Sequence, residues 1–264
     1  MPTPAASVSF CLVLCSALFI LPACAETAPA EEPAPDPSAG FDALLRQHVD
    51  EAGLVDYQAL REAPAALESY VAYLADVDLE SGTDAEKLAL LINAYNAFTL
   101  QLIVEHPGIA SIFDIPEDQR WDHVRWNLGG TDYSLNQIEH EIIRPVFDEP
   151  RIHWVLVCAA LDCPPLRPQI YTAQQLDEQL EAQTEWVHAS PKHVRYDAST
   201  NVLSLTPLYE WYGEDFGPGD KTQAVLKYVA GYVPGVAQAL SEGRTPRIQW
   251  LNYDWALNVQ PGRG

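Results

Sequence analysis

Two cysteines and a histidine lie close together in PRIHWVLVCAALDCPPL, residues 150–166. Thiol-dependent hydrolysis needs a thiolate, a histidine that generates it, and a third group that orients the histidine. Cys158 is the better nucleophile candidate, because it ends an apolar run and a turn or helix start after it would expose the sulfur to backbone N–H groups. Cys163 is less suited, since Pro164 and Pro165 lack two donors and impose an extended backbone.

The base for Cys158 is either His153 or His140. We expect residues 152–158 to form the central strand of the domain, and side chains alternate along a strand. His153 and Cys158 would therefore point to opposite faces unless the strand bends, whereas His140 on a preceding helix escapes this objection. Glu139 is the expected orienting group. It is adjacent to His140 on the predicted helix, and adjacent helical residues point about 100° apart, so Glu139 could orient His153 more easily than it could orient His140.

The two cysteines also allow a structural interpretation. A Cys158–Cys163 disulfide would close a short loop, would stabilise the fold by little more than ~2 kcal/mol, and would disable Cys158 as a nucleophile. Zinc is a further alternative, because Cys158, Cys163, His140 and His153 supply two sulfurs and two nitrogens. The Cys-x4-Cys spacing is wide for zinc and the histidines are not paired, so we place zinc below the disulfide and expect no metal or cofactor.

The segment LYEWYGEDFG (208–217) supplies Trp211 and Asp215, which we expect to line a binding pocket together with Cys163. The carboxylates in this segment are of the residue types found in a glycosidase carboxylate pair or a calcium site. A solvated acidic face is the better interpretation in a chain with a net charge of −22. The same charge repels phosphates and anionic headgroups, so nucleic acid is not an expected partner.

A long helix over residues 83–105 is predicted to be the buried spine of the fold. Thr83 and Glu86 form a capping box at its start, and Pro107 follows its end. Asn93 and Asn96 lie three residues apart on one face, and a buried amide that lacks partners costs ~1–3 kcal/mol. They either bind the backbone of a neighbouring loop, which we favour, or line a pocket.

The remaining elements mix helices with short strands. Apolar periodicity predicts further helices at 41–52, 65–77, 134–143, 171–188 and 222–233. Two hairpins are predicted, one around Gly129-Gly130 and one joining 193–196 to 202–205. The absence of regular βαβ alternation favours an α+β fold, with mixed helices and a sheet that contains antiparallel strands.

The N-terminal region predicts an export signal. An apolar run from Val8 to Leu21 ends in Leu-Pro-Ala-Cys, which resembles a bacterial lipobox with Cys24 as the acylated residue. Residues 1–23 would then be a signal peptide and 25–40, rich in Pro, Ala and Glu, a disordered tether. Residues 41–264 would form a single globular domain. Ala25 and Glu26 after the cysteine favour the outer membrane over the inner one; an ordinary secretory signal is the alternative.

Five segments together resemble the domain-of-unknown-function family 547, found in bacterial envelope proteins and at the C-terminus of some plant proteins. They are LINAYNAFTLQLIVEHP, SLNQIEHEIIRP, PRIHWVLVCAALDCPPL, LYEWYGEDFG and YDWALN, and they occur in the order of the family. The resemblance implies a fold similar to papain-like cysteine hydrolases, but no general activity.

Residues and resemblance together predict a cysteine-dependent hydrolase or acyl-transferase of the bacterial envelope. It would be anchored by an N-terminal lipid facing the periplasm, and it would act on a peptide, an amide or an envelope polymer. The alternative is a non-catalytic binding or scaffold module that contains the Cys158–Cys163 disulfide.

Overall fold

The computed structural model describes residues 1–5 and 36–262. The predicted signal core, Cys24 and tether residues 25–35 lie outside the described residues. The predicted tether ends too late, because helix α1 (Pro37–His48) already includes residues 37–40. Asp36 caps this helix by accepting a hydrogen bond from the Ser38 N–H, and Pro37 suits the first turn, where its missing N–H costs nothing.

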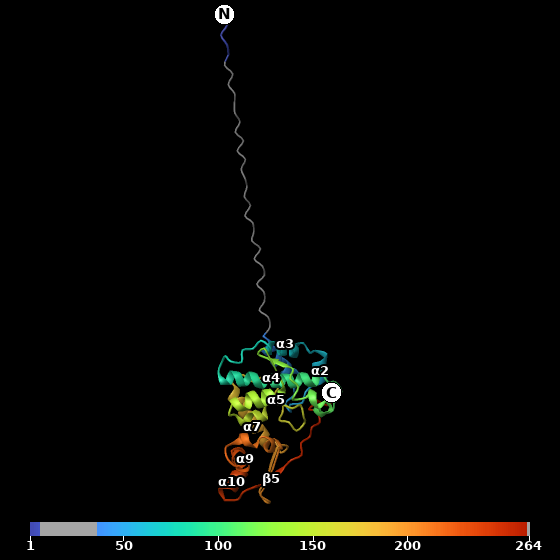
Figure 1. Cartoon of the computed structure of the whole chain (residues 1–264), viewed down its shortest axis with the longest axis vertical. Helices are drawn as coiled ribbons and strands as arrows, with labels where there is room; N and C mark the ends of the chain where they lie inside the picture. Colours follow the sequence, from blue (N-terminus) through green and yellow to red (C-terminus); the bar gives the residue numbers. More distant parts are fainter. Residues whose placement is uncertain (6–35, 263–264) are drawn as a thin grey trace. The chain divides into compact units, whose positions relative to one another are not determined.

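Three helices cover one side of the long helix α4 (Asp84–Val104), as Figure 1 shows. Helix α3 (Ala65–Leu74) contacts both α1 and α4, and the short α2 (Tyr57–Glu62) contacts α4. The Phe41 ring on α1 stacks on Tyr70 of α3 with 4.4 Å between centroids. These contacts bury the apolar faces that the sequence periodicity predicted.

Helix α4 is the buried spine of the fold. The Thr83–Glu86 capping box is confirmed, since each side chain accepts a hydrogen bond from the other residue's backbone N–H. The helix is long and apolar enough to cross a membrane, yet 78% of its most apolar stretch is buried within the protein. In the described part of the chain it is therefore the core helix of a folded domain.

A hairpin and an irregular helix follow α4 in the chain. Strands β1 (Trp126–Leu128) and β2 (Thr131–Tyr133) pair antiparallel, and Gly129 and Gly130 both have positive φ, as the predicted two-residue turn requires. Ser134 and Gln137 form the second predicted capping box. The helix after them runs through three consecutive parts: α5 (Leu135–Gln137), the π-helix η3 (Ile138–Ile143) and α6 (Arg144–Val146).

The predicted strand at 152–158 does not form. Residues Pro150–Trp154 are instead a 3₁₀ helix, η4, and 155–159 have turns and irregular backbone. Residues 152–157 are all buried, so the apolar run indicated burial correctly but not conformation, which periodicity cannot assign to so short a segment. The objection to His153 that rested on strand alternation therefore does not apply.

Helix α7 (Leu176–Ala189) begins later than predicted. The reason is Asn93, whose amide binds both the N–H and the C=O of Tyr171 at 2.9 and 2.8 Å. Both backbone groups of Tyr171 are thereby bonded outside the helix, which excludes Tyr171 from α7.

A three-stranded sheet has the order β3-β4-β5. Strands β3 (Val194–Asp197) and β4 (Val202–Leu205) form the predicted antiparallel hairpin, and β5 (Arg247–Trp250) pairs parallel to β4. The other short elements are η1 (Ile112–Asp114), η2 (Glu117–Gln119), α8 (Leu208–Trp211), η5 (Gly213–Phe216), α9 (Lys221–Ala230) and α10 (Pro234–Ser241). The α+β class is confirmed.

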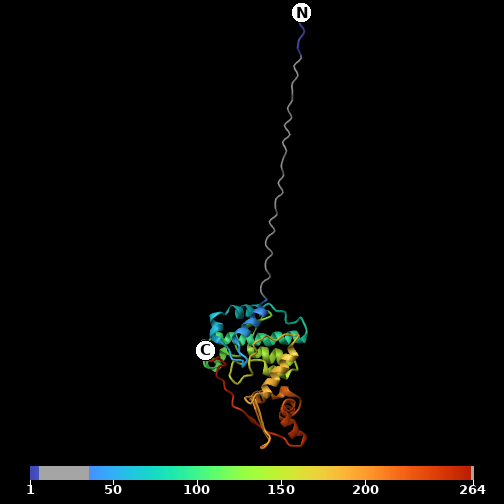
Figure 2. The ribbon, with the colours of Figure 1, turned by 180° about the vertical axis from the view of Figure 1, so that it is seen from behind.

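The last described segment returns to the N-terminal half of the domain, where Figure 2 shows the C-terminus beside the first helices. Isolated bridges join Ala256 to Ser111, Leu257 to Ala160 and Val259 to Val55. Backbone bonds run from Leu161 N–H to the Ala256 carbonyl at 2.7 Å and from Asn258 N–H to the Ala159 carbonyl at 3.0 Å. The chain after Cys158 is thus paired to residues almost a hundred positions later.

Gly53 offers a test of how tightly this region is packed. Its φ is +76°, and a Cβ there would lie 2.4 Å from Cβ and 2.6 Å from Cα of Pro165. Gly53→Ala should therefore lower the free energy of unfolding by about 2–4 kcal/mol, from backbone strain plus a clash. Gly108→Ala is the matched control, because φ is +81° but nothing lies within 4 Å, and it should cost about 1 kcal/mol. Equal losses in urea unfolding would contradict the close contact.

Candidate functional site

Asn96 holds the segment that leads to Cys158. Its amide donates to the Val155 carbonyl at 3.0 Å, and its oxygen accepts from the Val157 N–H at 3.1 Å. These bonds take the place of a strand ladder for a buried backbone. Asn93 and Asn96 thus bind loop backbone, the interpretation we favoured, and neither residue is in the lining of the cavity described next.

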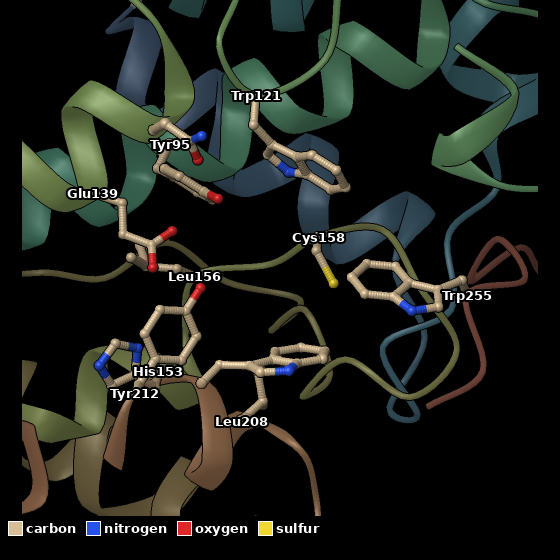
Figure 3. A pocket seen from close by; sticks show the side chains of 11 residues that line it. Tyr95, Trp121, Glu139, His153, Leu156, Cys158, Leu208, Tyr212 and Trp255 are labelled. Carbon is tan, nitrogen blue, oxygen red and sulfur yellow. The ribbon is translucent and has the colours of Figure 1, made fainter. Parts of the chain in front are cut away.

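A cavity of about 340 Å³ lies beside this segment (Figure 3). The Cys158 sulfur points into it, with Trp121 and Trp255 on one side and Glu139, Tyr212 and His153 on the other. The lining residues share a strong aromatic bias and are Tyr95, Trp121, Asn136, Glu139, His153, Leu156, Cys158, Leu208, Trp211, Tyr212 and Trp255.

Cys158 occupies a turn that surrounds its sulfur with donors. The next residue, Ala159, has φ +57°, a conformation that is rare for residues other than glycine. Residues with such backbone conformations occur frequently at functional sites. Hydrogen bonds from the Cys163 thiol, the Tyr253 hydroxyl (3.2 Å) and the Ala160 N–H lower the pKa of Cys158 below its ordinary value. They outweigh burial and the nearby charge of Glu139, both of which raise it. The site therefore favours a thiolate at Cys158.

Cys163 is the partner that donates. It is buried, it accepts the Cys158 N–H at 3.1 Å, and burial together with the neighbouring Cys158 raises its pKa well above the ordinary value. Burial and the two sulfurs likewise raise the pKa of Tyr253, which makes the phenol the donor. Both cysteines are free thiols, so the disulfide of the alternative interpretation is not formed, and Cys163 lies outside the aromatic cavity.

Glu139 contributes the carboxylate of the cavity. It projects from the π-helix η3, a helix type that recurs at functional sites, and only 6% of the residue is exposed. A hydrogen bond links it to Tyr212, whose pKa is raised by burial and by Glu139 itself. In Figure 3 the Tyr95 side chain lies on the same side of the cavity as Glu139 and Tyr212, with its hydroxyl directed into the cavity.

His153 is in the cavity wall but is engaged elsewhere. Its Nε2 lies 2.7 Å from Oδ2 of Asp215, and its ring stacks on Tyr212 with 4.1 Å between centroids. The Arg144 guanidinium donates two hydrogen bonds to the same carboxylate, at 2.7 and 2.9 Å. Burial alone would raise the pKa of Asp215, but the bonds from His153 and Arg144 bring it well below its usual value. Asp215, and not Glu139 as predicted, orients His153.

His140 is not part of the cavity. Its side chain is 36% exposed, its Nδ1 lies 3.1 Å from the Arg144 guanidinium, and the Glu139 carboxylate is 3.9 Å away. In the part of the chain that the structure describes, no hydrogen bond joins Cys158 to a histidine. No group of three or more His, Cys, Asp or Glu among those residues is arranged to hold a metal ion, so the four zinc candidates do not converge.

Sequence reasoning missed several of the residues that shape the site. Trp211 lines the cavity wall as expected for a pocket residue, but Tyr95, Trp121, Tyr253 and Trp255 were not singled out. Tyr95 stands directly before Asn96 on a buried helix, and a buried tyrosine hydroxyl needs a partner, which is a usable signal. Nothing in the sequence connects Tyr253 to a cysteine so far away.

Residues 79–186 match the family described as protein of unknown function, DUF547. The chain therefore resembles this family over the region that holds α4, the π-helix and both cysteines. Comparisons with curated proteins and with solved structures found no match. The papain-like fold stays a prediction.

The donors around Cys158 make a pH-dependent prediction. Tyr253→Phe and Cys163→Ala each remove one hydrogen bond to the thiolate, so the pKa of Cys158 should rise and alkylation should need a higher pH. A bond to a charged group is worth about 1.5–3 kcal/mol, which corresponds to a midpoint shift of about one to two pH units. The measurement is the iodoacetamide rate at Cys158, by mass spectrometry, from about pH 5 to 10.

Tyr73→Phe is the control for this series, because Tyr73 is 39% exposed and lies outside the cavity. Its profile should match that of the unmodified protein. A common midpoint near the ordinary thiol value of about 8.5 in every protein would show that the donors do not act on Cys158.

Proposed function

We propose that the protein is a cysteine-dependent hydrolase or acyl-transferase with Cys158 as the nucleophile. The observation that carries this proposal is the sulfur of Cys158, which opens into an aromatic cavity while three donors lower its pKa. A buried structural cysteine would have a raised pKa, as Cys163 does. A thiolate in a shaped cavity is the arrangement that covalent catalysis requires.

The proposed reaction needs no histidine to generate the nucleophile. The Cys158 thiolate attacks the substrate carbonyl carbon, a C–S bond forms, and the carbonyl electron pair moves to oxygen. Collapse of this intermediate breaks the bond to the leaving amine or alcohol, which takes a proton; Tyr253, already bonded to the sulfur, is the donor in place. Water or an acceptor amine then attacks the thioester carbonyl and gives its proton back to the Tyr253 oxygen. Collapse of this second intermediate breaks the C–S bond, releases the acid or the new amide and regenerates the Cys158 thiolate.

His153 has a positioning role in this proposal. Its bond to Asp215 and its stack on Tyr212 fix the phenol that in turn binds Glu139. In Figure 3 the Tyr212 ring lies between His153 and the sulfur. Glu139, Tyr95 and Tyr212 form the polar end of the cavity that holds the substrate.

The alternative function is a non-catalytic binding or scaffold module. The aromatic cavity supports binding equally well, so only covalent chemistry separates the two proposals. A structural disulfide has less support, because the two sulfurs are free and share a hydrogen bond.

Acyl transfer can be trapped with a generic donor. After incubation with p-nitrophenyl acetate and an acid quench, peptide mass spectrometry should find an acetyl thioester on Cys158. Cys158→Ser should lose this adduct by at least about a hundredfold, since a serine hydroxyl without a base is a poor nucleophile. Cys163→Ser is the matched control and should keep it at a reduced rate. An unreactive Cys158, or quantitative pairing with Cys163 in protein isolated without reductant, would favour the binding module.

We further propose, from the N-terminal sequence, that the protein is anchored in the bacterial envelope through lipid on Cys24 and faces the periplasm, in the outer membrane. Cells grown with radiolabelled palmitate should label the protein, and Cys24→Ser should abolish the label, because the acyl groups attach to that residue. Cys15→Ser, upstream in the apolar run, is the control and should keep the label. Label that persists in the Cys24 variant would contradict the anchor.

A further inference from the structure

The charges around the cavity are one-sided. Among residues 1–5 and 36–262, Glu139 is the only acidic residue that lines it, and no lysine or arginine does. Two guanidinium groups lie over rings of the lining, that of Arg144 at 5.3 Å from the Tyr212 centroid and that of Arg120 at 5.9 Å from the Trp121 centroid. Arg144 is paired with Asp215 and also lies 3.3 Å from Glu214. The chain as a whole carries −22. This electrostatic setting disfavours an anionic substrate and attracts a cation.

The walls of the cavity reinforce this preference. Five of the lining residues are tyrosine or tryptophan: Tyr95, Trp121, Trp211, Tyr212 and Trp255. The face of an aromatic ring carries negative potential, and rings arranged around a cavity bind ammonium groups through cation–π attraction. Tyr95 is 3% exposed whereas Trp211 is 42% exposed, so Tyr95 lies at the deep end of the cavity and Trp211 at its mouth, with the other three rings partly exposed.

The deep end also offers hydrogen-bond acceptors. A carboxylate has about four lone-pair positions, and the bond with Tyr212 uses one of them at Glu139. The remaining positions can accept N–H donors from a ligand between Tyr95 and Tyr212. A primary ammonium group has three such donors and a positive charge, and so satisfies both the carboxylate and the rings.

We infer that the cavity binds its substrate through a primary ammonium group held by Glu139, Tyr95 and Tyr212, with the reacting carbonyl toward Cys158. The inference deepens the proposed function and rests on it for the position of the carbonyl alone. The substrate class is then an amide or ester that carries a protonated amine. A neutral sugar stacked on the tryptophans is the competing occupant.

Binding can be measured without any reaction. The probe is n-butylammonium chloride, with 1-butanol as the neutral molecule of the same shape, titrated against intrinsic tryptophan fluorescence of the full chain at neutral pH. The ammonium ion should bind at least about tenfold more tightly than the alcohol, because only it gains the charge-assisted contacts. Methyl glucoside should not compete. Equal affinity for the ion and the alcohol, or binding of the glucoside alone, would overturn the inference.

Substitutions then locate the ammonium group. Glu139→Gln should weaken n-butylammonium at least about tenfold and leave 1-butanol unchanged, since it removes a charge but little volume. Glu141→Gln is the matched control, because Glu141 lies on the same π-helix but is exposed. An unchanged affinity in the Glu139 variant, with circular dichroism showing that it is folded, would contradict the site.

Cys158→Ser separates this inference from the proposed function. It should abolish acyl trapping yet keep the preference for the ammonium ion, because the sulfur is not among the three groups that hold it. If the unmodified protein is not acylated at Cys158 but still prefers the ammonium ion, the proposed enzymatic function is contradicted and the ammonium site is not. Trapping at Cys158 without that preference would contradict the ammonium site alone.

Discussion

The hydrogen bonds around residues 155–163 are the constraint on which the site depends. Most of these residues are buried but they belong to no sheet, so their backbone polar groups must be bound by other means. Asn96 of α4 binds it before Cys158, and Ala256 and Asn258 bind it after. The turn at Ala159 is fixed between these anchors, and it places the sulfur in the cavity. Helix α4 is consequently both the core of the fold and the support of the chemistry.

The electrostatics of the site follow from the same arrangement. The C-terminal segment that pairs with the turn also brings Tyr253 to Cys158, and the turn itself brings Cys163 and the Ala160 N–H. Three neutral donors thus stabilise a negative sulfur where a papain-like enzyme would use a histidinium. His153 is left to position Tyr212 through Asp215, which explains a histidine that lines the cavity without contacting the thiol.

Most of the features that the sequence predicted correctly are local ones; the backbone contacts of Asn93 and Asn96 are the exception, and there the sequence indicated only that a buried amide needs a partner. The capping boxes at Thr83 and Ser134 and the Gly129-Gly130 turn each involve residues within a few positions, so short patterns identify them. The strand at 152–158 was wrong because its backbone partner, Asn96, stands about sixty residues away, where no pattern reveals it. The prediction of Glu139 as the orienting group of His153 was wrong for the same reason, since the residue that does bind His153, Asp215, follows it by 62 positions.

The ionisation of the two sulfurs is the most direct test of this account. In protein labelled with ¹³Cβ-cysteine and kept reduced, NMR follows each thiol separately through a pH titration. We predict that the Cys158 signal titrates well below the ordinary thiol value of about 8.5, while the Cys163 signal does not titrate until far above it. Two signals that titrate together near that value, or two at the position of a disulfide under mild reducing conditions, would contradict a preformed thiolate at Cys158.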